Sequence, residues 1–171
     1  MTDEDFLRAT LGHLDLVHSL ARRLMPSREA AEDLVQETYL RALQGWRKQP
    51  PDAVAPWLAT ICLNTGRSTF RRAAVRPVEI LDADAGRDVS APADVERQVI
   101  GRLDAEAVHR ALWRLPEAQR EAITLMDLCG FTAAEVAEMI GSPRGTVLAR
   151  VHRGHKALAE LVREEVYDSD A

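Results

Sequence analysis

Apolar residues recur at three- and four-residue intervals along most of this chain, the spacing that places them on one face of an α-helix. The first such stretch runs from about residue 3 to residue 24, with apolar positions at Phe6, Leu7, Leu14, Val17, Ala21 and Leu24. Further helices are predicted over about residues 27–43, 56–72, 96–115 and 116–130. No stretch alternates apolar and polar residues as a half-buried strand does, so the pattern predicts an all-α protein.

Turn and cap residues set the expected ends of the helices in the first half. Ser27 follows a proline and is expected to cap the second helix. Gly45 is expected to end that helix, and the proline-containing segment 46–55 is expected to form a loop. Pro56 should then begin the third helix.

Two short helices near the C-terminus are predicted to form a helix-turn-helix. Thr132 and Glu135 have the spacing of a capping box, and Gly141 is expected to end the helix that they begin. Ser142 should cap the next helix, with Pro143 in its first turn. Helices joined by so short a turn cross steeply, and the second helix is basic, as is typical of a helix that enters a DNA major groove. A helical hairpin with a solvated basic face remains the alternative.

The second of these helices separates into a buried side and a possible DNA-reading side. Leu148, Ala149, His152 and Arg153 project from one side, whereas Val147, Val151, Leu158 and Leu161 are better placed to pack inward. At its start, the free backbone N–H groups of Arg144 and Gly145 favour a phosphate.

Charge is distributed unevenly, which bears on domain organisation. The 171 residues carry a net charge of −5, so any contact with DNA has to be local. Residues 79–107 contain 3 Lys or Arg and 8 Asp or Glu, and residues 78–95 show no sustained period. We therefore predict two small helical domains, 1–77 and 96–171, joined by a flexible acidic linker at 78–95. The acidic tail after residue 163 is expected to fray.

Two polar faces in the first half are candidate binding surfaces. Asp33, Gln36, Glu37 and Leu40 form a stripe that suits a basic or amphipathic partner helix, although such a stripe is commonly just a solvated face. On the third helix, Asn64, Arg67, Ser68 and Arg71 share one face, and Trp57 lies near the Asn64 side. Amide, hydroxyl, guanidinium and indole groups together suit unpaired bases and phosphates. An exposed polar face with a covering tryptophan is the alternative.

Neither catalytic nor metal-binding chemistry is indicated. The sequence has no glycine-rich phosphate loop, nucleophile elbow or metal-ligand spacing, so we predict no cofactor and no enzyme activity. Cys62 and Cys129 are expected to be reduced core thiols. An acidic N-terminus and the absence of a long apolar run favour a cytoplasmic protein without membrane insertion.

Three segments in order resemble the extracytoplasmic-function (ECF) group of the sigma-70 family of bacterial RNA polymerase sigma factors. AEDLVQETYLRAL (31–43) resembles the family's region 2.2, and WLATICLNTGRSTFRR (57–72) resembles its promoter-melting helix. LPEAQREAITL and AAEVAEMIGSPRGTVLARVHRG resemble its region 4. The resemblance covers nearly the whole chain and implies that it binds core RNA polymerase and directs promoter-specific initiation.

The resemblance also implies roles for individual residues. Asp33, Gln36 and Glu37, with Leu40 beside them, match positions that hold the β′ clamp of the polymerase, and region 4 implies contact with the β flap. Asn64 matches a position that contacts the −10 element, with Trp57, Arg67, Ser68 and Arg71 around it. The segment 46–55 matches a loop that captures a flipped base. In region 4, Leu148, Ala149, His152 and Arg153 match positions facing the −35 element, and Thr146 and Arg150 match backbone contacts beside Arg144 and Gly145.

The same resemblance implies partners for the chain, and two alternative functions remain beside it. The family implies promoter DNA as a ligand and an anti-sigma factor as a regulator. Leu148 and Ala149 would read thymine methyl groups or shape instead of hydrogen-bonding edges. One rival is a stand-alone helix-turn-helix regulator with a helical interaction domain. A second rival is an enzyme with a helical regulatory domain.

Overall fold

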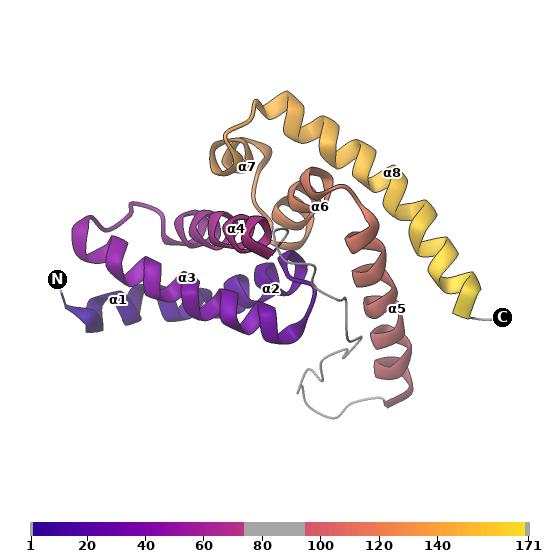
Figure 1. Ribbon diagram of the computed structural model, residues 1–171, viewed down its shortest axis with the longest axis horizontal. Helices are drawn as coiled ribbons and strands as arrows, with labels where there is room; N and C mark the ends of the chain where they lie inside the picture. Colours follow the sequence, from indigo (N-terminus) through magenta and orange to yellow (C-terminus); the bar gives the residue numbers. More distant parts are fainter. Residues whose placement is uncertain (1, 74–94, 170–171) are drawn as a thin grey trace.

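The structure is a computed structural model that describes residues 2–73 and 95–169, and all of the regular elements among these residues are helices (Figure 1). In the first half these are α1 (Asp3–Thr10), the 3₁₀ turn η1 (Leu11–His13), α2 (Leu14–Leu24), α3 (Arg28–Lys48) and α4 (Val54–Ala73). In the second half they are α5 (Val95–Arg114), α6 (Glu117–Ile123), the π-helix η2 (Thr124–Leu128), α7 (Ala133–Ile140) and α8 (Arg144–Ser169). The predicted all-α class is confirmed. The predicted linker, 78–95, lies outside the described residues except at its last position.

The first half is a bundle in which α2, α3 and α4 pack against one another (Figure 1). Helix α2 buries Val17, Leu20, Ala21 and Leu24, which follow one another at helical spacing. Ser27 caps α3 as predicted, because its side chain accepts a hydrogen bond from the Ala30 N–H.

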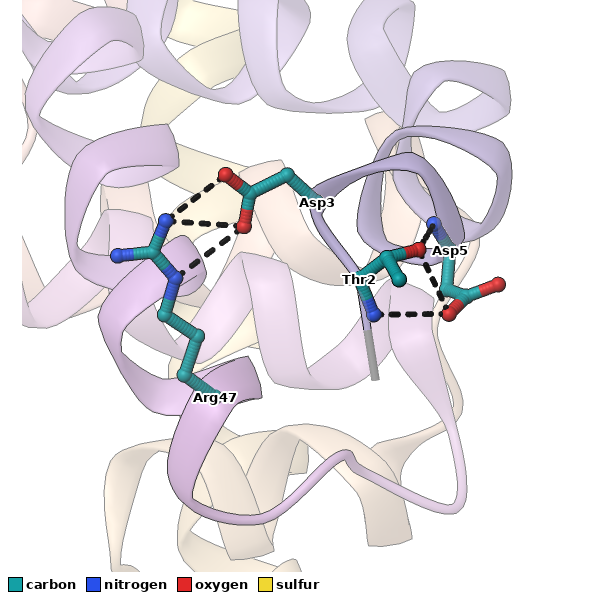
Figure 2. A network of polar contacts seen from close by, with 4 residues as sticks. All are labelled: Thr2, Asp3, Asp5 and Arg47. Carbon is teal, nitrogen blue, oxygen red and sulfur yellow. Dashed lines mark hydrogen bonds and ion pairs between the residues drawn. The ribbon is translucent and has the colours of Figure 1, made fainter.

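Helix α1 is fixed to the far end of α3 by polar contacts at its start (Figure 2). The Arg47 guanidinium donates to both carboxylate oxygens of Asp3, at 2.9 and 2.8 Å from Nη2. Thr2 and Asp5 form a capping box there, and hydrogen bonds from Thr2 lower the pKa of the Asp5 carboxyl. Beneath these contacts, the Phe6 ring lies edge-on to Trp46. The N-terminal helix is therefore packed onto the bundle.

The end of α3 differs from the prediction. The helix runs through Gly45 to Lys48, and the loop before α4 is only residues 49–53. Gly45 serves close packing and not helix termination, because a Cβ there would lie 3.1 Å from the Trp57 ring. Trp46, expected in the loop, is buried in the core. Helix α4 also begins two residues before Pro56, at Val54.

The second half packs α5 and α6 along α8. A small apolar cluster of Leu112, Leu115 and Ile123 lies against Leu158 and Leu161 of α8. At the closest approach, a Cβ on Gly154 would lie 2.5 Å from Ile123 Cδ1. Helix α8 continues to Ser169, so the tail that was expected to fray is helical to that residue.

The predicted turn between α7 and α8 is present. Thr132 and Glu135 form the capping box of α7, and Gly141 ends that helix in the left-handed conformation at φ 66°. Helix α8 begins at Arg144, where the Pro143 carbonyl accepts hydrogen bonds from the N–H groups of Thr146 and Val147. Pro143 therefore occupies the position expected for Ser142, one residue later than predicted.

The two halves are in direct contact. Helices α4 and α7 pack together, and α2 packs against η2 and α5. Leu125, Phe131, Val136 and Met139 of the second half belong to the same buried apolar cluster as the core of the first half. Figure 1 shows α6 and α7 beside α4, with α5 and α8 extending away from the first half.

Candidate functional surfaces

One face of α8, opposite its buried side, is open to solvent. Leu148, Ala149, His152 and Arg153 are exposed, as the sequence predicts, and we call them the α8 face. Val147 and Val151 are buried on the other side, and Leu158 and Leu161 are half-buried there. This division leaves a helix surface free to enter a groove.

The α8 face is basic and begins at a free helix end. Arg144 and Gly145 are exposed at the first turn, where helix geometry leaves N–H groups without intrahelical partners. Nothing lies within 4 Å of a Cβ placed on Gly145, so a DNA backbone has room to approach there. Thr146 and Arg150 are half-buried beside this entrance. The helix start therefore suits a phosphate, by its dipole and its donors.

The candidate residues of α4 are brought together on one side of the helix, which we call the α4 face: Trp57, Asn64, Arg67, Ser68 and Arg71. Asn64 and Arg71 are exposed, whereas Trp57, Arg67 and Ser68 are half-buried. Trp57 is turned partly toward the core, where the centroid of its ring lies 6.4 Å from that of the buried Trp46. Its indole is therefore less available than the sequence suggested.

Arg67 is held by the second half of the chain. Its Nε donates to Glu121 Oε1 at 2.8 Å and its Nη2 donates to Oε2 at 2.5 Å. The Glu121 side chain is 3% exposed and that of Arg67 is 28% exposed. Hydrogen bonding to Glu121 raises the pKa of the Arg67 guanidinium. The α4 face is therefore partly occupied by a carboxylate.

The stripe on α3 is exposed and borders a groove. Asp33, Gln36 and Leu40 are exposed, and Glu37 is half-buried; we call these four the α3 face. Asp33 and Glu37 line a groove of about 280 Å³ between α3 and α4, together with Ala30, Leu34 and Thr69. Leu40 has a large apolar side chain, and this residue is 58% exposed to solvent. Acidic groups beside an apolar one suit an amphipathic basic partner.

Both cysteines are free thiols; Cys62 lies in the core as predicted, whereas Cys129 is half-buried. Burial raises the pKa of the Cys62 thiol to about 12 and that of Cys129 to about 11. Both are therefore protonated at neutral pH, which disfavours nucleophilic or redox chemistry. Across the described parts of the chain, no group of three or more His, Cys, Asp or Glu side chains is arranged to hold a metal ion.

The sequence patterns did not reveal the carboxylates of the second half that lie beside the α4 face. Glu121 was not singled out, although it stands beside Ala122 and Ile123 in an apolar stretch. A charged residue on the buried side of a helix requires a partner, so the position of Glu121 in an apolar stretch was the signal that could have identified it. Glu135 and Glu138 line a cleft of about 360 Å³ with Trp57, and no sequence pattern connects positions so far apart.

Comparison with known proteins finds matches in both halves of the chain. Residues 11–76 match the family description Sigma-70 region 2, and residues 105–158 match Sigma-70, region 4. The ECF RNA polymerase sigma factor SigM of Mycobacterium tuberculosis is 37% identical over 151 residues, which cover 88% of this chain and 73% of SigM. The chain belongs to the ECF sigma factors of the sigma-70 family. As such, it is a sigma factor that directs promoter-specific transcription initiation by RNA polymerase.

Other relatives and solved structures support the same family. EcfG of Rhodopseudomonas palustris is 34% identical to this sigma factor, over 85% of this chain and 78% of EcfG. The sigma factor RpoE of Bartonella quintana, solved in complex with the anti-sigma factor NepR, matches with a TM-score of 0.75 and 30% identity, covering 94% of this chain and 98% of that chain. CnrH, solved with the cytosolic domain of CnrY, shares the fold at a TM-score of 0.66 and 23% identity, over 99% and 92% of the two chains. Within the described residues, none of the helices has the length and apolar character to cross a membrane.

Proposed function

We propose that the three faces of this sigma factor each bind a different part of the transcription complex. The α3 face binds the β′ clamp of core RNA polymerase, the α4 face binds the opened −10 element, and the α8 face reads the −35 element. Exposure of the α8 face at the end of a capped helix-turn-helix carries the proposal, because it is the most complete DNA-reading surface on the chain.

Promoter opening draws on binding energy and involves no chemical step of this chain. Unpaired bases bind to the amide and indole of Asn64 and Trp57, while Arg67, Ser68 and Arg71 hold phosphates. Trapping unstacked bases shifts the equilibrium of the duplex toward the open form. This chain is therefore proposed to act without a cofactor and without enzyme activity.

The α8 face reads duplex DNA through shape and thymine methyl groups as well as charge. Leu148 and Ala149 have no hydrogen-bonding groups beyond the backbone, so they contact methyl groups. His152 and Arg153 supply donors to base edges, and Arg144, Gly145, Thr146 and Arg150 hold the backbone. The preferred −35 element should accordingly contain thymines.

Domain boundaries and partners complete the proposal. Residues 1–77 form the clamp-binding and −10 domain, and residues 96–171 form the −35 domain, which also contacts the β flap. Residues 78–95 pass through the polymerase, where their acidic side chains resemble nucleic acid in a basic channel. The protein works in the cytoplasm, where bacterial RNA polymerase acts. An anti-sigma factor regulates it, since the similar RpoE was solved in complex with the anti-sigma factor NepR.

Reconstituted transcription tests the proposal. Purified core polymerase, with and without this chain, is incubated with a promoter library, and transcripts are sequenced from their 5′ ends. Specific start sites that require both components support the proposal. Tight operator binding by the chain alone, without any effect on polymerase, would favour the stand-alone regulator. A search for an inhibitor by co-purification from the native cell tests the anti-sigma factor separately.

A further inference from the structure

Basic side chains from three helices gather where α2 meets α5. Arg22 and Arg23 lie in the last turn of α2, which packs against α5 (Figure 1). His109 and Arg110 belong to α5, and Arg120 belongs to α6, which packs against α5 in turn. We call these five residues the α2–α5 basic cluster. None of them belongs to the α3, α4 or α8 face.

The cluster is centred on His109 and the neighbouring Trp113. The guanidinium carbon of Arg120 lies 4.0 Å from the centroid of the Trp113 ring, and the centroid of the His109 ring lies 6.5 Å from the same point. His109 is half-buried, and burial lowers the pKa of its imidazole, as do the positive charges of the four arginines of the cluster. An imidazole that neighbouring cations keep from becoming charged marks a region of positive potential.

Several cations of the cluster have no anionic partner among the residues that the structure describes. Arg22 and Arg23 form no ion pair there, and Arg23 donates instead to the carbonyl and the hydroxyl of Ser19, at 3.2 and 3.1 Å. Arg120 is 7% exposed, and its buried Nε has no hydrogen-bond acceptor in the described part of the chain. A buried guanidinium with an unpaired N–H costs free energy, which a bound anion would offset.

The carboxylates nearby do not neutralise the cluster. Glu165 accepts a hydrogen bond from Arg110 at 2.8 Å, and Glu121 is engaged with the α4 face. Burial has the largest effect on the pKa of Arg120 and lowers it, whereas Glu117 and Glu121 act in the opposite direction. The two arginines of α2 are therefore left without a compensating charge.

We propose that the α2–α5 basic cluster binds a small anion that carries two or more linked phosphate groups. A guanidinium holds phosphate oxygens with two parallel hydrogen bonds, so arginines on α2 and on α5 and α6 can hold different phosphates of one ligand. A compact ligand fits better than a nucleic-acid strand, because most of the cluster is half-buried or buried at a junction of helices. Inorganic polyphosphates and nucleoside di- or triphosphates share this chemistry.

Calorimetric titration of the full-length chain with inorganic pyrophosphate tests the site. At pH 7 and low salt, we expect pyrophosphate to bind at least about tenfold more tightly than orthophosphate, because it can engage arginines on both sides of the cluster. Equal affinities for the two anions would indicate an adventitious ion only and would overturn the proposal.

Paired arginine substitutions locate the binding. Arg22→Gln/Arg23→Gln removes the α2 side of the cluster and should weaken pyrophosphate binding about tenfold or more. Arg8→Gln/Arg28→Gln removes the same charge from exposed ion pairs on α1 and α3, so it is the matched control, with less than a twofold change expected. An equal loss in the two double variants would mean that pyrophosphate responds only to net charge, against the proposal.

The imidazole of His109 reports on the site in the natural chain, so this readout holds even if the arginine substitutions alter stability. Proton NMR follows its titration, and His109→Gln assigns its resonance. A bound phosphate offsets the charge of the neighbouring arginines, so saturating pyrophosphate should raise the pKa of His109 by about 0.5 or more. A response of His152 and His155 without one of His109 would place the anion on α8 and would overturn the proposal.

Further ligands distinguish the two sources of linked phosphates. Tripolyphosphate and ATP, compared without Mg²⁺, present equally long phosphate chains. Equal affinities would support an inorganic polyphosphate, and at least about tenfold tighter binding of ATP would support a nucleotide. If pyrophosphate does not bind, whereas a mixed-sequence 12-nucleotide single strand binds and is lost in Arg22→Gln/Arg23→Gln, the cluster is a nucleic-acid contact and the proposal is wrong. None of these measurements involves polymerase, so their failure leaves the proposed function intact.

Discussion

The two faces proposed to bind DNA, the α8 face and the α4 face, differ in how the fold exposes them. The α8 face lies open on a helix whose other side is buried, and no other element covers it among the described residues. On the α4 face, Arg67 is paired with Glu121 and Trp57 borders an acidic cleft. The α8 face is therefore open to solvent, whereas the α4 face is partly occupied by side chains of the second half.

The difference matches what each face is proposed to bind. Duplex DNA is present before initiation, so a duplex-reading surface gains nothing by being covered. Unpaired DNA appears only at a promoter that polymerase is opening, and an exposed single-strand surface would bind other nucleic acid in the meantime. Under the proposed function, the pairing of Arg67 with Glu121 would therefore disfavour binding of unrelated single strands.

Substitutions at two adjacent positions of α8 have the largest expected effects, and they distinguish a packing residue from a residue that contacts DNA. Val147 is fully buried and Leu148 is 39% exposed. Val147→Asp buries an unpaired charge, which should cost at least about 3 kcal/mol in the free energy of unfolding. Leu148→Asp should change stability by less than about 1 kcal/mol but should abolish −35 binding, since it places a carboxylate against phosphates. Chemical denaturation and duplex binding of both variants test this; equal destabilisation would show that Leu148 is also a packing residue.

Arg153→Ala should weaken the open face without affecting the fold. A groove contact of this kind is worth about 1–3 kcal/mol, so −35 duplex affinity and −35-dependent transcription should fall roughly 5- to 150-fold. Arg163→Ala removes an exposed arginine two to three turns further along the same helix and serves as the control. Unchanged transcription from a −35-dependent promoter would mean that the groove face is assigned to the wrong side of α8.

Asn64→Ala should act on the covered face with a smaller effect. Asn64 is exposed and lies beside Arg67 without taking part in the ion pair, so its loss should not alter the contact between the halves. We expect promoter opening to fall by about tenfold, or about 1.4 kcal/mol, with affinity for core polymerase unchanged. Permanganate footprinting measures opening, and Gln44→Ala on α3 is the control. Loss of polymerase docking would place Asn64 in a different role.

Local patterns in the sequence predicted the order of the helices and the exposed side of α8, but not the end of α3 or the 3₁₀ turn η1 within residues 3–24. The Thr132 capping box, Gly141 and the inward positions Val147 and Val151 depend on neighbours within one turn or two, and the structure has them as predicted. The order of helices and the all-α class follow from the same short-range periodicity.

Contacts between distant segments account for what sequence reasoning did not reach. Gly45 was taken as a helix end, whereas it makes room for the Trp57 ring from the next helix. Trp46 was placed in a loop because prolines follow it, but it fills the core beside Phe6. The Arg67 to Glu121 pair joins residues 54 positions apart, and nothing local to either residue specifies the other. The assignment of individual residues to polymerase and DNA stays a prediction.

Acidification should destabilise the folded chain, with the smallest effect of the four. Burial lowers the pKa of His109, and so do Arg22 and Arg23 of α2, Arg120 of α6 and Arg110 of its own helix. Below its ordinary pKa near 6.5, the unfolded chain therefore binds a proton that the folded chain resists, so stability falls as pH drops from about 7 toward 5.5. We expect the thermal midpoint of the natural chain to fall by about 1–2 °C more over this range than that of His109→Gln. His18→Gln, on the exposed side of α2, controls for loss of a histidine, and parallel pH profiles for the natural chain and His109→Gln would show that His109 does not contribute to the pH dependence of stability.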